Sequence, residues 1–65
     1  MNTKTDRLLY VQEVAAMLRK TPSALRYMVH KGQDVPRSAK IGGRRMWRES
    51  DVIAWLDAKF EEETV

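Results

Sequence analysis

Residues 40–48 read KIGGRRMWR, a run in which apolar side chains alternate with cations on either side of a glycine pair. Glycine readily adopts the positive φ of tight turns, and short alternating runs flanking such a turn are typical of a β-hairpin. We therefore predict strands over residues 39–41 and 45–48, joined by a tip of Gly42-Gly43-Arg44. The alternation predicts that Ile41 and Trp47 point inward, whereas Lys40, Met46 and Arg48 point outward. Because two strands alone are marginally stable, this hairpin must pack against other elements.

The segment before the hairpin predicts a first helix over residues 12–18. Its apolar side chains recur with helical spacing and share one face, namely Val11, Val14, Met17 and Leu18. Ahead of it, Leu8 and Leu9 are expected to form a hydrophobic staple or a short extended arm. Valine cannot cap a helix through its side chain, so Val11 is a poor residue for the position before this helix.

A second helix is bounded by stronger signals. Thr21 is a good N-cap, Pro22 suits the first helical position, and Gly32 suits the position just past the end. Only Arg19 and Lys20 separate the first helix from this cap. So short a connection is typical of a helix-turn-helix.

The second helix has two distinct faces. Leu25, Met28 and Val29 share one face and are expected in the core. The opposite face carries polar and aromatic side chains, which are Ser23, Arg26, Tyr27 and His30. From the sequence alone, this second face is either a recognition surface or an ordinary solvated helix face.

A last helix is predicted to start at Ser50 as its N-cap, with an apolar stripe formed by Val52, Ile53, Trp55, Leu56 and Phe60. We expect one domain over residues 8–60, a flexible tail over residues 1–7 and an acidic tail over residues 61–65. The expected fold is mainly α with a small β-hairpin, arranged as a winged helix-turn-helix.

Charge is distributed unevenly along the 65 residues. Residues 1–48 contain 11 basic and 3 acidic side chains, a balance of +8, whereas residues 49–65 contain 1 basic and 6 acidic side chains, a balance of −5. A basic region of this kind either meets the phosphates of a nucleic acid or is an ordinary scattered basic surface beside an acidic tail, and the charge alone leaves both open.

Several other function classes have little support. The chain has no cysteine and a single histidine, His30, so we expect no metal site, no cofactor and no catalytic nucleophile–base pair. The protein is therefore expected not to be an enzyme. We also expect no membrane association, no small-molecule ligand and a location in the bacterial cytoplasm.

The chain resembles the excisionase and AlpA-like group of small winged helix-turn-helix proteins, relatives of the MerR-type DNA-binding domain. The resemblance rests on the run LYVQEVAAML (residues 9–18), the capped second helix to Gly32, Pro36, the run IGGRRMWR (residues 41–48) and the run SDVIAWL (residues 50–56). The chain departs from the pattern at Val11, where Ser or Thr is usual, and at Arg19, where Gly or Asn is usual. Arg19 is therefore expected in a disfavoured backbone region or in a lengthened first helix.

The resemblance implies that the second helix enters the DNA major groove and that the wing contacts the minor groove and backbone. The implied DNA-binding residues are Thr21, Ser23, Arg26, Tyr27, His30, Lys40, Gly43, Arg44 and Arg45. It further implies an excisionase, a recombination directionality factor that bends double-stranded DNA beside a site-specific integrase and self-associates cooperatively on it. The alternatives are an AlpA-like transcriptional regulator and a protein-interaction module that docks through the acidic last helix.

Overall fold

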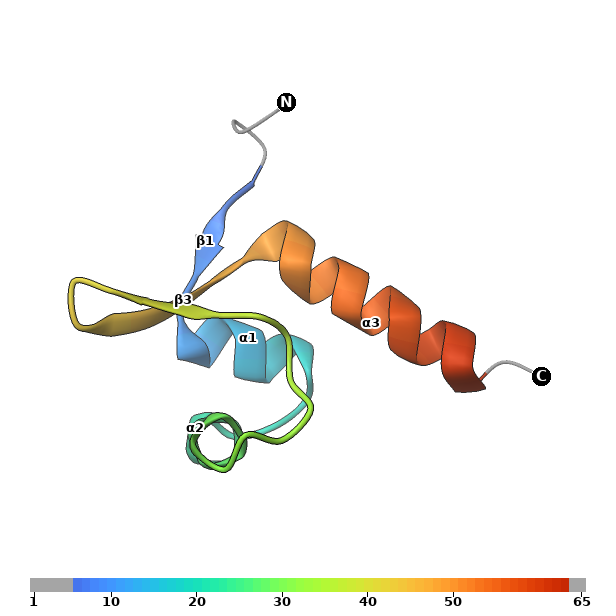
Figure 1. Cartoon of the computed structure of the whole chain (residues 1–65), viewed down its shortest axis with the longest axis horizontal. Helices are drawn as coiled ribbons and strands as arrows, with labels where there is room; N and C mark the ends of the chain where they lie inside the picture. The colour runs from blue at the N-terminus through green and yellow to red at the C-terminus, as the bar shows by residue number, and fades with distance from the viewer. Residues whose placement is uncertain (1–5, 64–65) are drawn as a thin grey trace.

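The computed structural model describes residues 6–63 and contains three helices and a small antiparallel sheet (Figure 1). The elements in chain order are β1 (Leu8–Leu9), α1 (Val11–Met17), α2 (Pro22–His30), β2 (Ala39–Ile41), β3 (Arg44–Arg48) and α3 (Glu49–Glu63). The strand order is β1-β3-β2. This mainly helical architecture confirms the predicted winged helix-turn-helix class. The predicted tails lie outside the described residues, except for residues 6–7 at one end and 61–63 at the other.

Helix α1 begins at Val11, so the position before it belongs to Tyr10 and the prediction that placed Val11 there was wrong. The carboxylate of Glu13 accepts the backbone N–H of Tyr10 at 2.7 Å, which supports this end of the helix. At the other end, Arg19 has a φ of 60°. The expectation of a disfavoured backbone region at Arg19 is thereby confirmed.

The left-handed residue at Arg19 closes α1 sharply. The Arg19 N–H donates to the carbonyl of Ala16 at 3.1 Å, and the Lys20 N–H donates to that of Ala15 at 2.8 Å. This pair of bonds is a Schellman motif, which satisfies carbonyls at the helix end and turns the chain toward α2.

Strand β1 completes the sheet, because Leu8 pairs with Arg48 and Leu9 pairs with Trp47. The sequence had suggested a staple or an extended arm here, and the arm is in fact a third strand. On the far side of β3, the wing is the hairpin of β2 and β3, in which Ile41 pairs with Arg44 and Lys40 pairs with Arg45.

Three predictions about the wing were wrong. Lys40 was expected to point outward, but it pairs with Arg45 and therefore lies on the sheet face of Trp47. Arg44 is the first residue of β3 and not part of the tip, which consists of Gly42 and Gly43 alone, with φ of 58° and 83°. Positive φ at both positions is the geometry of a two-residue type I′ turn. Ile41 is 49% exposed, because it pairs with Arg44 and therefore lies on the sheet face opposite to Trp47.

The core lies where the inner face of the sheet meets the three helices. Its buried side chains are Leu9, Val11, Val14, Ala15, Leu25, Trp47 and Val52, with Leu18, Val29, Val35 and Leu56 packed against them. The indole N–H of Trp47 donates to the carbonyl of Pro36 at 3.2 Å. Trp47 therefore joins the wing to the loop between α2 and β2.

Helix α3 starts at Glu49 directly after β3, so the prediction of Ser50 as its N-cap was wrong. The N-terminal segment supplies the acceptors at this end. The Ser50 N–H donates to the Asp6 carboxylate at 3.1 Å, and the Glu49 N–H donates to the Arg7 carbonyl at 2.8 Å.

The predicted apolar stripe of α3 is only partly buried. Val52 is buried and Leu56 packs on the core, but Ile53 is 46% exposed and Phe60 is 70% exposed. Trp55 is half-buried, and its indole N–H donates to Asp34 at 3.0 Å. Figure 1 shows the distal half of α3 extending away from the other elements. Ile53 lies nearer the start of the helix, on a side that the core does not cover.

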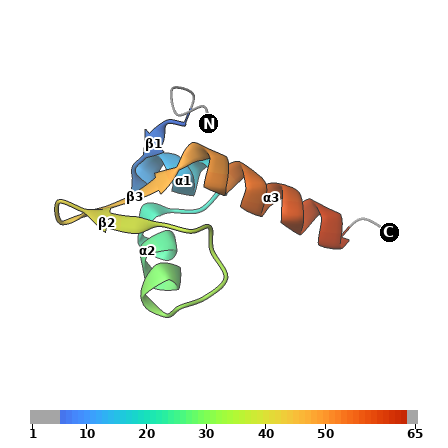
Figure 2. The same cartoon turned by 45° about the horizontal axis from the view of Figure 1, so that its top comes forward.

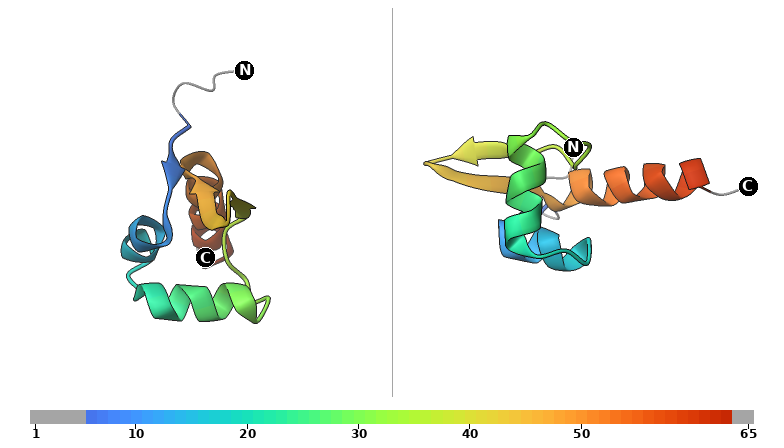
Figure 3. Two further views of the ribbon diagram at one scale, coloured as in Figure 1. Left: turned by 90° about the vertical axis from the view of Figure 1, so that its left-hand side faces the viewer. Right: turned by 90° about the horizontal axis from the view of Figure 1, so that it is seen from below.

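The wing and α3 project in opposite directions. Figure 2 and the right-hand view of Figure 3 show the hairpin reaching past α1 and α2 on the side away from α3. The molecule is accordingly flat and elongated, with extents of 41 × 32 × 19 Å. This arrangement leaves α2 and the wing together at one end.

Candidate nucleic-acid interface

Helix α2 is held at both ends by local hydrogen bonds. The Thr21 hydroxyl accepts the N–H of Ala24 at 3.1 Å, as predicted for an N-cap. At the C-terminal end, the Gly32 N–H donates to Val29 and the Gln33 N–H donates to Met28 at 2.9 Å, with a φ of 70° at Gly32. This Schellman motif and the cap fix the helix in length and direction.

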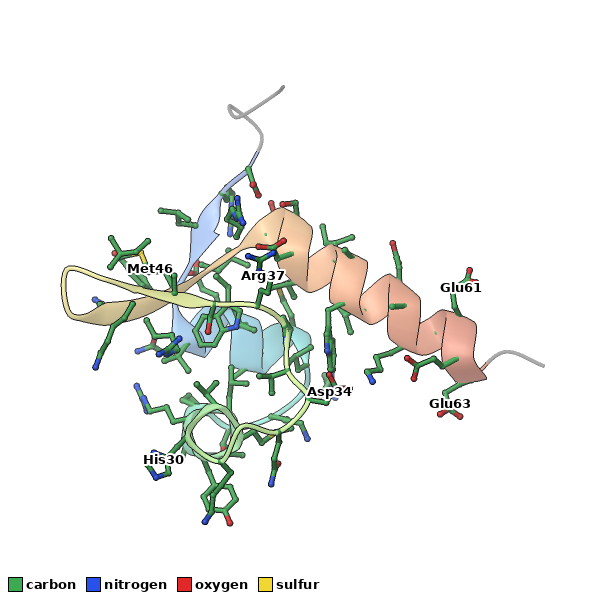
Figure 4. All side chains as sticks on the ribbon, in the orientation of Figure 1. His30, Asp34, Arg37, Met46, Glu61 and Glu63 are labelled. Carbon is green, nitrogen blue, oxygen red and sulfur yellow. The ribbon has the colours of Figure 1, made fainter. Side chains whose placement is uncertain are left out.

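The polar face of α2 is open to solvent. Ser23, Arg26, Tyr27 and His30 are all exposed, whereas Leu25 is buried and Met28 and Val29 are half-buried. Figure 4 shows His30 pointing outward from α2 on the side away from α3. The predicted division of the helix into a core face and a free face is therefore confirmed, and the free face is available to a partner.

The wing carries its cations on both sheet faces. Register places Lys40 and Arg45 on the same face as Trp47, toward the helices, and Arg44 on the other face. Arg45 is half-buried, and its Nη1 donates to the Ser38 hydroxyl at 2.8 Å. Lys40 and Arg44 are exposed.

A cleft of about 380 Å³ lies between α2 and the wing. We call it the interface cleft, and it is lined by Val11, Arg26, Val29, His30, Gly43, Arg44, Arg45 and Trp47. Two of the predicted recognition-helix residues and three of the predicted wing residues thus meet at one place. Thr21, Ser23, Tyr27 and Lys40 do not line it, although Ser23 and Tyr27 continue the exposed face of α2.

Carboxylates within residues 6–63 do not neutralise the interface cations. The ion pairs of this part of the chain all use Arg7, Arg48 or Lys59 as the cation. Arg26, Arg44 and Arg45 have no carboxylate partner among them. A cluster of such cations over an apolar floor is suited to a polyanion.

The acidic side chains gather elsewhere. Glu61 and Glu63 lie near the far end of α3, and Asp34 lies on the side of the body that faces α3 (Figure 4). A hydrogen bond from Lys59, and a second from Trp55, hold the pKa of the Asp34 carboxyl below its ordinary range, and the same Asp34 bond raises the pKa of Lys59. Charge is therefore separated in space as well as in sequence.

Neither a metal-binding cluster nor a membrane-spanning helix is found in residues 6–63. Residues 6–63 contain no cluster of three or more His, Asp or Glu side chains that could hold a metal ion. Among the helices of this same segment, none combines the length and the apolar composition needed to cross a bilayer.

Sequence reasoning missed two features of this end of the molecule. Arg19 and Lys20, in the turn before α2, are exposed cations beside the predicted set. Tyr10 lies under the guanidinium of Arg44, whose central carbon is 3.7 Å from the ring centroid. The basic turn could have been noticed from its composition, but the contact between Tyr10 and Arg44 depends on strand register.

The sequence was compared with known families, proteins and structures. Residues 8–59 match the model of a family described as a helix-turn-helix domain, which covers every element from β1 through most of α3. No curated protein and no solved structure matches the chain.

Proposed function

Since the matched region spans most of the chain, the protein belongs to this helix-turn-helix domain family of small excisionase-like and AlpA-like DNA-binding domains, and we propose that it binds double-stranded DNA sequence-specifically. Helix α2 enters the major groove, where Arg26 reads base edges and Ser23 and Tyr27 contact the backbone. The wing lies along the adjacent backbone and minor groove, where arginine is favoured. The interface cleft is the observation that carries this proposal, because it joins the cations of both elements.

The finer role that we propose is that of an excisionase. The protein performs no bond chemistry and instead stabilises a bent duplex beside the sites of a site-specific integrase. Bending a site costs on the order of 1–6 kcal/mol, which several bound domains can offset together. A single module of this size buries too little surface for tight specific binding, so several copies or a contact with the integrase complete the complex.

A salt series tests DNA binding. The wing carries three cations, Lys40, Arg44 and Arg45, that form no ion pair within residues 6–63. Three phosphate contacts give a slope of about −2.7 in log affinity against log salt, which is roughly a 40-fold loss between about 50 and 200 mM. Fluorescence anisotropy with a labelled mixed-sequence duplex measures this slope.

A matched arginine serves as the control for this experiment. Arg37 is exposed and lines a separate groove with Leu8, Ile41 and Met46 on the outer face of the sheet. Arg37→Ala should therefore leave the slope unchanged, whereas Arg44→Ala should lower its magnitude by about 0.9. If the duplex affinity of the parent protein does not change with salt, the proposed DNA binding is wrong and an interaction module that docks through α3 is favoured.

An in vitro recombination assay tests the finer role. With its cognate integrase, the protein should stimulate recombination between attL and attR and should leave unchanged or inhibit that between attP and attB. If excision is unchanged while a nearby promoter responds to the protein, a transcriptional regulator of the AlpA type replaces the excisionase.

A further inference from the structure

One ring contact, between Tyr10 and Arg44 at the turn end of the wing, is much closer than the others. The guanidinium carbon of Arg44 lies 3.7 Å from the ring centroid of Tyr10, whereas Lys31 is 5.8 Å from Tyr27 and Lys59 is 5.5 Å from Trp55. A separation of 3.7 Å is van der Waals contact between the ring and the guanidinium group. Arg44 and Tyr10 are therefore stacked, and arginine is the cation best suited to such stacking.

Strand register explains how the two side chains meet. Leu9 pairs with Trp47 at the end of β1, and Tyr10 follows it directly as the residue before α1. Arg44 lies three residues before Trp47, at the turn end of β3. The pairing of β1 with β3 thus brings Tyr10 within reach of the long Arg44 side chain. The bond from Tyr10 N–H to Glu13 fixes the backbone of Tyr10 at the start of α1.

Neither helix capping nor the core accounts for a tyrosine at this position. Tyr10 occupies the N-cap of α1, where Ser, Thr, Asp or Asn would be favoured, and it contributes no side-chain bond to the cap. Its side chain is 40% exposed and lies outside the buried core. What its ring does contact is the guanidinium of Arg44.

We propose that Tyr10 is a positioning residue, which holds the guanidinium of Arg44 at the rim of the interface cleft for contact with DNA phosphate. This inference rests on the proposed DNA binding. The ring covers one face of the guanidinium and leaves its in-plane N–H donors free. Because the Arg44 side chain is already ordered before DNA arrives, less conformational entropy is lost on binding.

The experiment measures duplex affinity of the full chain by anisotropy, using the labelled mixed-sequence duplex at low salt. Tyr10→Ser removes the ring but places a good N-cap residue before α1, so the helix keeps its start. We expect Tyr10→Ser to weaken binding roughly threefold to tenfold. Tyr10→Phe keeps the ring and should bind within about twofold of the parent.

Two further observations separate positioning from a general structural effect. In an Arg44→Ala background, Tyr10→Ser should change affinity by less than about twofold, because the group that it positions is gone. Tyr10→Ser should also keep the salt slope of the parent, whereas Arg44→Ala should reduce its magnitude by about 0.9. Ile53→Ser on the exposed face of α3 is the control for a general loss of apolar surface.

Arg44→Lys keeps the test decisive if Tyr10→Ser unfolds. Lysine retains the charge but lacks the planar face, so we expect a loss like that of Tyr10→Ser with an unchanged salt slope. The inference fails if Tyr10→Ser or Arg44→Lys binds as tightly as the parent, or if Tyr10→Ser loses as much in the Arg44→Ala background. A parent protein that shows no salt-dependent duplex binding refutes the proposed function itself.

Discussion

Replacing Trp47 with phenylalanine would test how strongly the wing is joined to the body of the protein. Trp47 is 1% exposed at the centre of the core, and its indole N–H donates to the carbonyl of Pro36 at 3.2 Å. Phenylalanine keeps an aromatic ring against Leu9 and the helices, but it has no donor and a smaller volume. The substitution therefore removes the buried hydrogen bond together with a limited part of the packing.

The expected loss of stability has two parts. Leaving the Pro36 carbonyl without its donor costs about 1–3 kcal/mol. The smaller ring buries about 40–50 Å² less apolar surface, which costs about 1 kcal/mol. Together they give about 2–4 kcal/mol, against a total stability of about 3–10 kcal/mol for 65 residues. The midpoint of thermal unfolding should fall by roughly 10–30 °C.

Far-UV circular dichroism during urea unfolding measures the loss, because the substitution itself changes tryptophan fluorescence. Ile53→Ala is the matched control, since Ile53 is half-exposed on α3 and should change stability by less than about 1 kcal/mol. A Trp47→Phe variant within about 0.5 kcal/mol of the parent would show that the bond to Pro36 and the packing around the indole contribute little, and would refute the reasoning.

Three further outcomes are expected. Arg26→Ala should weaken binding to the preferred site by about 1–3 kcal/mol and binding to a random duplex only slightly. If competitive binding shows the same loss of affinity on both duplexes, Arg26 does not read base edges. Gly43→Val should lower the melting temperature through backbone strain of about 1–3 kcal/mol, because Gly43 has a φ of 83°. A steric clash is not the cause, since the space that a side chain would enter there is open. An unchanged melting curve would contradict this expectation. Because the Asp34 pKa is lowered, its bonds stabilise the fold at neutral pH and are lost as pH falls below about 4. Asp34→Asn should therefore be less stable than the parent at neutral pH and differ less from it at low pH in urea titrations.

Where the prediction from sequence succeeded, the signals were local. Thr21, Pro22 and Gly32 mark the ends of α2 because capping and a positive φ depend on the residue itself and its immediate neighbours. The glycine pair marks the wing turn for the same reason. The two faces of α2 followed from helical periodicity, so the candidate recognition residues were placed on an exposed surface without any knowledge of tertiary contacts.

Predictions from the sequence failed where the structure depends on strand register or on packing between distant segments. The tip of the wing is one residue shorter than predicted, and this shift turned Ile41 outward and put Arg44 on a strand. The start of α3 depends on Asp6 and Arg7, which lie at the opposite end of the chain. Ile53 and Phe60 fit an apolar stripe, but Val52 and Leu56 are the members of that stripe that meet the core.

The sequence by itself thus determined the winged helix-turn-helix class, the limits and faces of α2 and the separation of charge along the chain, because all three follow from residue type and short-range spacing. Only the tertiary structure decided that Arg26 and His30 share a cleft with Gly43, Arg44 and Arg45, and that Tyr10 stacks on Arg44. These contacts join residues that are far apart in the chain. Their geometry is set by the pairing of β1, β2 and β3 and by the core beneath them, which no local pattern encodes.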